Sequence, residues 1–319
     1  MKILKRLLGY GLLIGVFVGG FYAVNRSQDI IDWYRLRDYV PTERIAQISD
    51  SVSLNEYGQT LFYVNDPAIT SDKQQFAVDC RTSNEIIVLG CHVTNGGIFL
   101  FDVEDERLNG IVEVTAAHEM LHAGYDRLAG DEKERVITML NRAYEDVAND
   151  RIRKTISAYE SRDPSVVPNE LHSILGSEVK DLPKELEDYY SQYFNDRSQV
   201  VVISNEYEAE FIKRQDRIEA FDAQLDELNS NIVRLEAQLT TDAQNLASRR
   251  SQLESQRGNP EQFNAGVRTY NAQVNQYNED IEVLRGIVAE YNGIVAQRND
   301  IAIEERELNE AIDSRIDAL

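Results

Sequence analysis

Two histidines four residues apart enclose a glutamate in this chain, at His118, Glu119 and His122. On a helix, residues four apart lie on one face, so both imidazoles can bind one metal ion. Glu119 can then reach a water molecule on that metal without being a ligand itself. Neutral imidazole is a zinc ligand, and zinc lowers the pKa of a bound water to about 7. The spacing therefore predicts a Zn²⁺ site with Glu119 as a general base.

The low histidine content makes this spacing informative. The chain has four histidines in all, and two of them have the metal-binding spacing. The apolar residues 111–117 before the motif are compatible with a helix, and Ala123 and Gly124 permit close packing. The alternative is an ordinary amphipathic helix with two surface histidines, and we favour the metal site.

A zinc site with two histidines needs a third protein ligand. Leu128 stands where the longer His-Glu-x-x-His-x-x-Gly-x-x-His pattern has its third histidine, so that class is excluded. A helix predicted over residues 169–181 offers Glu170 in its first turn and Glu178 on its apolar face, where a lone carboxylate is costly unless paired or metal-bound. The two glutamates are two turns, about 12 Å, apart. We prefer Glu170 as the ligand, with Glu178 as the alternative.

The motif at residues 118–122, followed by a helix that begins Glu170-x-x-Ser173, resembles the gluzincin class of zincin metallopeptidases. Gluzincins take their third ligand from such a helix, often with Asp or Asn where this chain has Ile174. The resemblance implies a zincin-like α+β domain and a zinc-dependent endopeptidase that hydrolyses peptide or protein substrates with a metal-activated water. A donor to the oxyanion is also implied, and five residues are candidates by type alone, with none assigned: Tyr125, His172, Tyr189, Tyr190 and Arg197.

A β-hairpin is predicted directly before the metal-binding helix. Residues 85–93 and 98–103 are rich in apolar and β-branched side chains, and the intervening Thr-Asn-Gly-Gly is a strong turn signal. An extended peptide can add to the edge of such a hairpin as a further strand; the hairpin can also be core alone. Elsewhere the patterns predict a strand at residues 60–64 and helical structure at residues 25–50, with one break at Pro41, and at residues 71–78, 131–160 and 184–196.

The N-terminus predicts a membrane anchor. Lys2, Lys5 and Arg6 precede an uncharged apolar run over residues 7–24, which is long enough to span a bilayer. Basic residues favour the cytoplasmic side, so we expect a single-pass cell-membrane protein with its catalytic domain outside. A cleaved signal peptide is the rival interpretation, but no small-x-small cleavage site follows the run.

An outward-facing domain lies in an oxidising environment, where disulfides persist. We therefore predict that Cys80 and Cys91 are bonded, the alternative being two separate buried thiols. The formal net charge of −22 excludes nucleic acid as a partner, because phosphate backbones bind basic surfaces.

The C-terminal third carries a heptad repeat. Apolar residues recur every seven positions from Phe211 to Leu253, and a second apolar series follows the break at residues 258–260. Two such runs around one break predict an antiparallel coiled-coil hairpin, with a parallel homodimer as the less favoured arrangement. The predicted domains are thus the anchor (1–26), the zincin-like domain (27–200) and the hairpin (201–319).

The hairpin opens a second hypothesis about function. A coiled coil can bind a protein partner, so the chain can also be a surface scaffold or adhesion protein. In that case the hairpin is the working part, and the zinc site is structural or catalytically inactive. A closed fourth position on the metal, with His172 as a ligand, would favour this alternative.

Overall fold

A computed structural model describes residues 27–81 and 87–316 of the 319-residue chain. The chain divides into two compact units. The first comprises the chain up to Glu208 together with residues 311–319, and the second comprises Ala209–Glu310. The second unit is therefore an insertion, because the last residues belong to the first unit. There the hydroxyl of Ser314 donates to the carbonyl of Val88 at 2.6 Å.

The sheet of the first unit has the order β1-β3-β2. Strand β1 (Ala68–Thr70) pairs parallel with β3 (Gly97–Phe101), and β2 (Gly90–Val93) pairs antiparallel with β3. The β2–β3 pair is the hairpin that the sequence predicts. Asn95 and Gly97 adopt positive φ angles of 61° and 138° at its turn, conformations that asparagine and glycine tolerate best. Strand β2 is an edge of this sheet.

The predicted zincin-like α+β fold is wrong. Helices make up 75% of the described residues, and the sheet has three short strands. Residues 60–64, predicted as a strand, belong largely to helix α4 (Glu56–Tyr63). Asn55 caps this helix by accepting from the backbone N–H of Gly58, and Leu61 and Phe62 are fully buried. The cap and this burial outweigh the local strand preference of the aromatic and β-branched side chains.

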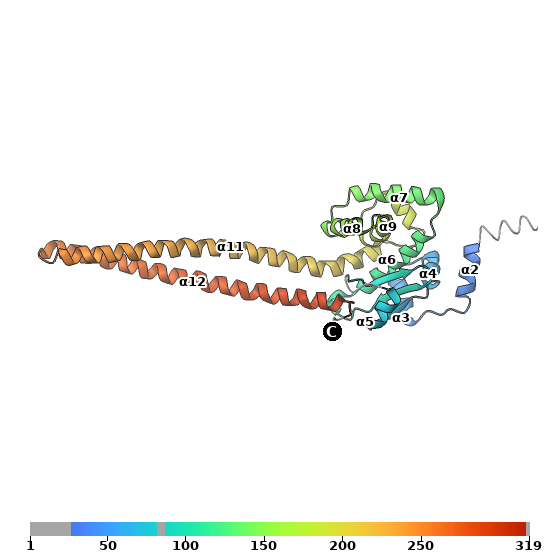
Figure 1. Cartoon of the computed structure of the whole chain (residues 1–319), viewed down its shortest axis with the longest axis horizontal. Coiled ribbons are helices and arrows are strands. Elements are labelled where there is room, and N and C mark those ends of the chain that lie inside the picture. Colours follow the sequence, from blue (N-terminus) through green and yellow to red (C-terminus); the bar gives the residue numbers. More distant parts are fainter. Residues whose placement is uncertain (1–26, 82–86, 317–319) are drawn as a thin grey trace, which may run out of the picture. The chain divides into compact units, whose positions relative to one another are not determined.

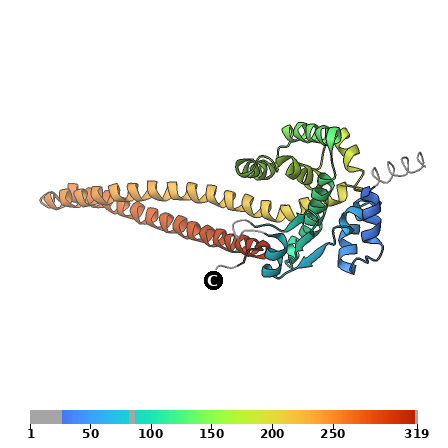
Figure 2. The same cartoon turned by 45° about the vertical axis from the view of Figure 1, so that its right-hand side comes forward.

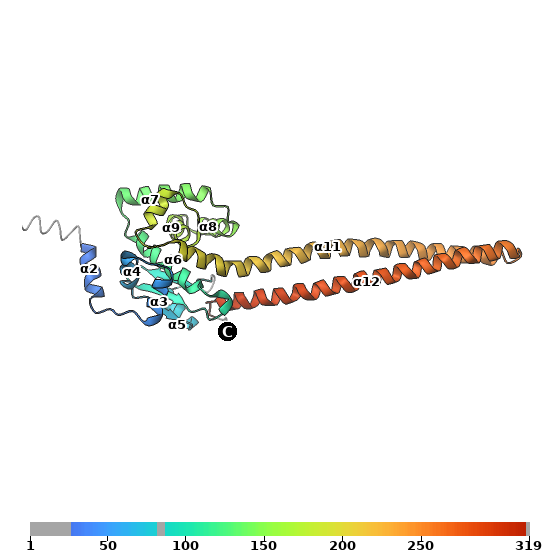
Figure 3. The same cartoon turned by 180° about the vertical axis from the view of Figure 1, so that it is seen from behind.

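Helix α6 (Ile111–Asp126) lies at the centre of the first unit (Figure 1). It packs against α9 (Val167–Glu178) on one side and against β2 and β3 on the other. The same arrangement is visible from behind in Figure 3. The remaining helices are α2 (Ser27–Leu36), α3 (Glu43–Ser51), α5 (Lys73–Cys80), α7 (Gly130–Glu145), α8 (Asp150–Arg162), α10 (Lys184–Tyr190) and the 3₁₀ turn η1 (Glu106–Leu108).

The single helix predicted over residues 131–160 is two helices, α7 and α8. The break falls at residues 146–149, where the side chain of Asn149 accepts from the backbone N–H groups of Arg151 and Ile152. An asparagine at this position satisfies the first amides of a new helix, so it starts α8 in a new direction. The separate direction of α8 matters because this helix forms one wall of the site described below.

The predicted single-pass membrane location has to be corrected. Within residues 27–81 and 87–316, no helix combines the length and apolar character needed to cross a bilayer. The run that predicted the anchor, residues 7–24, lies outside the described residues. The described residues therefore do not support the predicted single-pass membrane location.

The predicted disulfide between Cys80 and Cys91 is confirmed. It joins the last residue of α5 to the edge strand β2, with the two Cα atoms 5.7 Å apart. A crosslink of this kind restricts the unfolded chain and stabilises the native state. Here it also fastens β2 at the position where that strand faces α6.

The second unit is made by parts of two long helices, α11 (Ser198–Ser255) and α12 (Pro260–Ile312), joined at residues 256–259 (Figure 2). Partners across the hairpin run in opposite directions: Arg298 donates to Asp222, and Gln238 to Asp280. Buried residues on α12 recur every seven positions, at Ile294, Ile301 and Leu308. This spacing is that of a coiled-coil seam.

Gly176 allows α9 to approach α6 closely. A Cβ atom at this position would lie 2.5 Å from Cδ1 of Leu121 and 2.7 Å from Cε1 of Tyr190. We predict that Gly176→Ala destabilises the protein by about 1–3 kcal/mol, because a well-packed core must shift to admit the methyl group. Urea unfolding followed by circular dichroism measures the change in midpoint.

Gly286→Ala is the matched control, since this α12 glycine has open space around its Cβ position. It should be neutral or stabilise by about 0.5–1 kcal/mol. A Gly176→Ala midpoint equal to the wild-type value would contradict the packing described for α9.

Candidate metal centre

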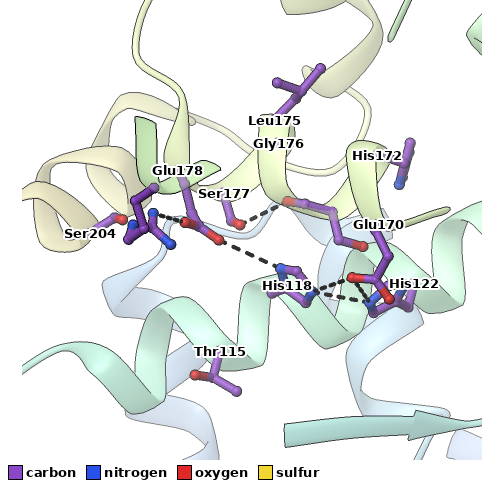
Figure 4. Close-up of polar contacts among 12 residues, drawn as sticks. Thr115, His118, His122, Glu170, His172, Leu175, Gly176, Ser177, Glu178 and Ser204 are labelled. Carbon is purple, nitrogen blue, oxygen red and sulfur yellow. Dashed lines mark hydrogen bonds and ion pairs between the residues drawn. The ribbon is translucent and has the colours of Figure 1, made fainter. Parts of the chain in front are cut away.

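The motif helix α6 presents both histidines to one point. Nε2 of His118 lies 3.0 Å from Nε2 of His122 (Figure 4). The ligand atoms of His118, Glu119 and His122 all lie within 4.8 Å of one another. Two imidazole nitrogens at this separation share a proton or bind a common cation. This group can therefore hold a metal ion.

Glu170 approaches the same point from α9. Its Oε2 lies 3.9 Å from Nε2 of His118 and 3.9 Å from Nε2 of His122. A point equidistant from these three atoms in their plane, here called the convergence point, is about 2.1 Å from each of them. Zinc bonds to nitrogen and oxygen are about 2.0–2.2 Å long. Oε2 of Glu170 is also buried without a hydrogen-bond partner in the described part of the chain. A buried carboxylate oxygen in this state fits a cation.

Glu178, the alternative ligand, takes a different position. Its Oε1 lies 3.9 Å from Nδ1 of His118, the ring nitrogen on the far side from the convergence point. Its Oε2 accepts from the guanidinium of Arg151. The two glutamates, two turns apart on α9, therefore face opposite nitrogens of the same histidine. This geometry favours Glu170 as the third ligand and Glu178 as a group that orients His118.

Asn169 orients the other histidine. Its Oδ1 lies 2.9 Å from Nδ1 of His122. Because an amide oxygen only accepts, Nδ1 carries the proton and Nε2 keeps its lone pair toward Glu170. This role of Asn169 was not predicted, because Ile174 stands where the gluzincin pattern often has Asp or Asn. The residue directly before Glu170 was the available signal, since its side chain lies in the same first turn of α9.

The electrostatics keep both histidines neutral. Burial lowers the pKa of His118 to about 4, with the nearby His172 and Arg151 acting in the same direction. Burial, followed by the neighbouring His118, lowers the pKa of His122 to about 3. Metal ligation requires unprotonated imidazole, so the two histidines need lose no proton at neutral pH.

Glu119 is buried between α6 and the edge strand. Burial, and then the charge of Glu170, raise the pKa of Glu119 to about 8. A backbone hydrogen bond at His92 on β2 acts in the opposite direction. The carboxylate is thus held next to the histidines by the strand that borders the site. A group in this environment exchanges protons near neutral pH, as a general base must.

These groups open into a cavity of about 600 Å³ bounded by α6, α8, α9 and β2. Tyr159 of α8 lines it and hydrogen-bonds the carboxylate of Glu170. Burial raises the pKa of Tyr159 well above its usual range, with Glu170 acting in the same direction, so its hydroxyl remains protonated. Tyr159 was not predicted as a site residue, because it lies on α8, in a stretch predicted as the end of one uninterrupted helix.

The five candidate oxyanion donors do not line this cavity. Nε2 of His172 lies 2.8 Å from the hydroxyl of Tyr189, within a buried cluster of aromatic rings. Tyr125 and Tyr190 belong to the same cluster, and Arg197 donates to the carbonyl of Val179 beyond the end of α9. Their positions are those of core residues. His172 is therefore not among the residues that line the cavity, and its Nε2 is engaged by Tyr189.

Comparison with known proteins gives no relative: no family model, curated protein or solved structure matches this chain. The site therefore has to be interpreted from its own geometry.

The geometry predicts that replacing Glu170 lowers the affinity for the metal more than replacing Glu178 does. We expect Glu170→Gln to lower the affinity for Zn²⁺ by more than about 100-fold, because a ligand charge is lost. Glu178→Gln should lower it by about 10-fold, the smaller effect of an orienting group. Competition with a colorimetric chelator measures both affinities. A larger loss for Glu178→Gln than for Glu170→Gln would reverse the assignment of the third ligand.

Proposed function

We propose that this protein is a zinc-dependent peptidase that hydrolyses peptide bonds with a metal-activated water. One observation carries the proposal. The side chains of His118, His122 and Glu170 converge on one point. A fourth group, the buried carboxylate of Glu119, faces the same cavity. This donor set and these spacings resemble those of gluzincin peptidases.

Zinc suits the donors. Two neutral imidazoles and one carboxylate are a ligand set of catalytic zinc, which keeps its fourth position open. When bound, the metal supplies a Lewis acid and lowers the pKa of water in the open position. The burial that holds both histidines neutral favours this cation, since imidazole nitrogen is a ligand that zinc prefers.

The chain's own residues have distinct roles in this proposal. Glu119 accepts the proton of the attacking water and passes it to the leaving amine. Asn169 and Glu178 hold the two imidazoles in their orientations through the Nδ1 atoms. Tyr159 holds the carboxylate of Glu170 through its hydroxyl. Each acts from a different position around the convergence point.

The edge strand supports a peptide as the substrate. Strand β2 lines the cavity at Gly90, Cys91 and His92 and pairs on one side with β3. Its other side can pair with an extended peptide, as edge strands do in β-augmentation. A Cβ atom at Gly90 would lie 2.9 Å from Cγ of Glu119. The glycine therefore lets the strand run close to the general base, so a paired peptide would present its backbone beside Glu119.

The alternative function, a scaffold with an inactive or structural zinc site, requires a closed fourth position. His172 was the candidate for that position. It is fully buried and hydrogen-bonded to Tyr189, outside the cavity lining. This arrangement supports an open site and hence the enzyme.

The test compares the full-length wild type with Glu119→Gln. Both proteins should bind about one Zn²⁺ per chain, since Glu119 is not a ligand in this proposal. Cleavage of a degenerate peptide library should fall by about 10²–10⁴-fold in the variant, the usual contribution of a general base. Mass spectrometry of the products and metal analysis of the same samples provide the two measurements.

Glu134→Gln, an exposed substitution of the same kind on α7, is the control and should cleave like the wild type. A chelator should abolish cleavage, and added Zn²⁺ should restore it. If both proteins bound zinc and neither cleaved the library, the peptidase hypothesis would be refuted and the metal site would stand. Absence of zinc in the wild type would remove the metal site as well.

A further inference from the structure

A single arginine connects the metal centre to the base of the inserted hairpin. The guanidinium of Arg151 on α8 donates through Nη2 to Oε2 of Glu178 and to Oε1 of Glu208. The other oxygen of Glu178, Oε1, faces Nδ1 of His118 at 3.9 Å. Figure 4 shows Glu178 between His118 and Ser204, which precedes Glu208 by one turn of α11. The groups thus form a chain in the order Glu208, Arg151, Glu178, His118.

Both carboxylates in this chain are buried. The side chains of Glu178 and Glu208 are 10% and 11% exposed, whereas that of Arg151 is 47% exposed. A buried carboxylate needs a partner of opposite charge, and here the two share one guanidinium. Arg151 is therefore held on two sides, and this fixes the direction from which it binds Glu178.

Glu208 belongs to the helix that forms the first arm of the hairpin. Helix α11 runs without a break from Ser198 to Ser255, and Glu208 is the last residue of the first unit along it. Residues beyond it belong to the second unit. The side chain that holds Arg151 is thus attached to the base of the hairpin.

We propose that Glu208 is a positioning residue for the metal centre, acting on His118 through Arg151 and Glu178. The inference rests on the proposed function, since it requires a metal ion bound at His118. Glu208 holds Arg151 in place, and Arg151 holds Glu178 with its free oxygen toward the imidazole. A carboxylate beside the second nitrogen of a ligand histidine orients the ring and raises its basicity. The position of α11 at its base thereby sets how tightly the site holds its metal.

The exposure of Arg151 explains why one pair is not enough. Without the charge of Glu208, Glu178 is the remaining ion-pair partner of Arg151 among the described residues, and nearly half of the arginine side chain faces solvent. The pair can then move toward water as a unit, and Oε1 of Glu178 leaves the imidazole. The loss would appear at the metal, although Glu208 is not among the residues that line the cavity.

The experiment measures Zn²⁺ affinity by chelator competition in the full-length chain. We expect Glu178→Gln to weaken binding by about 10-fold, at the lower end of the range for groups that orient a ligand, and Glu208→Gln by about 3–10-fold, because it acts one step further from the ligand. The double variant should bind like Glu178→Gln alone, because the chain of contacts is already broken there. Glu206→Gln, an exposed change of the same kind on the same helix, is the control and should bind like the wild type.

The double variant separates positioning from general packing. If Glu208→Gln only loosened α11, it would weaken binding equally with Glu178 present or replaced, and that result would overturn the proposal. Equal affinities for Glu208→Gln and wild type would also overturn it, while leaving the peptidase hypothesis intact. No zinc bound by the wild type would instead refute the metal site itself.

Arg151→Lys is a second variant that keeps the charge and removes the planar guanidinium. It should weaken Zn²⁺ binding in the wild-type background and have no further effect beside Glu178→Gln. The absorption spectrum of bound Co²⁺ adds a readout of ligand geometry and should change in Glu208→Gln but not in Glu206→Gln. An unchanged Co²⁺ spectrum in Glu208→Gln would count against a positioning role.

Discussion

The close packing of α9 on α6 is the constraint on which the site depends. A helix that carries two histidines four residues apart gives only two ligands, and the third must come from another element. Gly176 permits this close approach, because a Cβ atom at its position would lie 2.5 Å from Leu121 and 2.7 Å from Tyr190. Because α9 lies this close, the side chains from its first turn reach α6. An apolar contact two turns away thus determines whether three ligand atoms can meet at one point.

The same packing explains why polar side chains on α9 have different roles at the site. Asn169 and Glu170 are neighbours in the first turn, and they face Nδ1 and Nε2 of the same histidine, His122. Glu178, two turns later, faces Nδ1 of His118. One helix therefore supplies a ligand candidate and both orienting groups. Burial raises the pKa of Glu170 to about 7, so without a cation part of its charge would be lost near neutral pH. A cation at the convergence point offsets that cost.

Local patterns were sufficient for the parts that depend on local geometry. The four-residue spacing on α6 and the Asn-Gly turn before β3 were predicted from neighbours in sequence, whereas the Cys80–Cys91 disulfide was predicted from an expected outward-facing location. The errors arose where distant contacts decide. Residues 60–63 belong to helix α4 because Leu61 and Phe62 are buried, and the sheet is too small for the α+β fold that was expected. Tyr159 could not be found from sequence, because its role follows from the break before α8 and the meeting of α8 with α9.

The chain returns to the first unit after the hairpin, so the hairpin is an insertion in that unit. A C-terminal appendage would be joined to the first unit at one end, but this hairpin is joined at both. At its start, Glu208 is tied through Arg151 to the carboxylate beside His118. At its end, Ser314 is 4% exposed and donates to the carbonyl of Val88, a residue of the cavity wall. The second attachment thus lies at the cavity wall, whereas the first reaches His118 through Arg151 and Glu178. Each includes a buried side chain, Glu208 in the first and Ser314 in the second, and polar bonds of buried groups are costly to leave unmade.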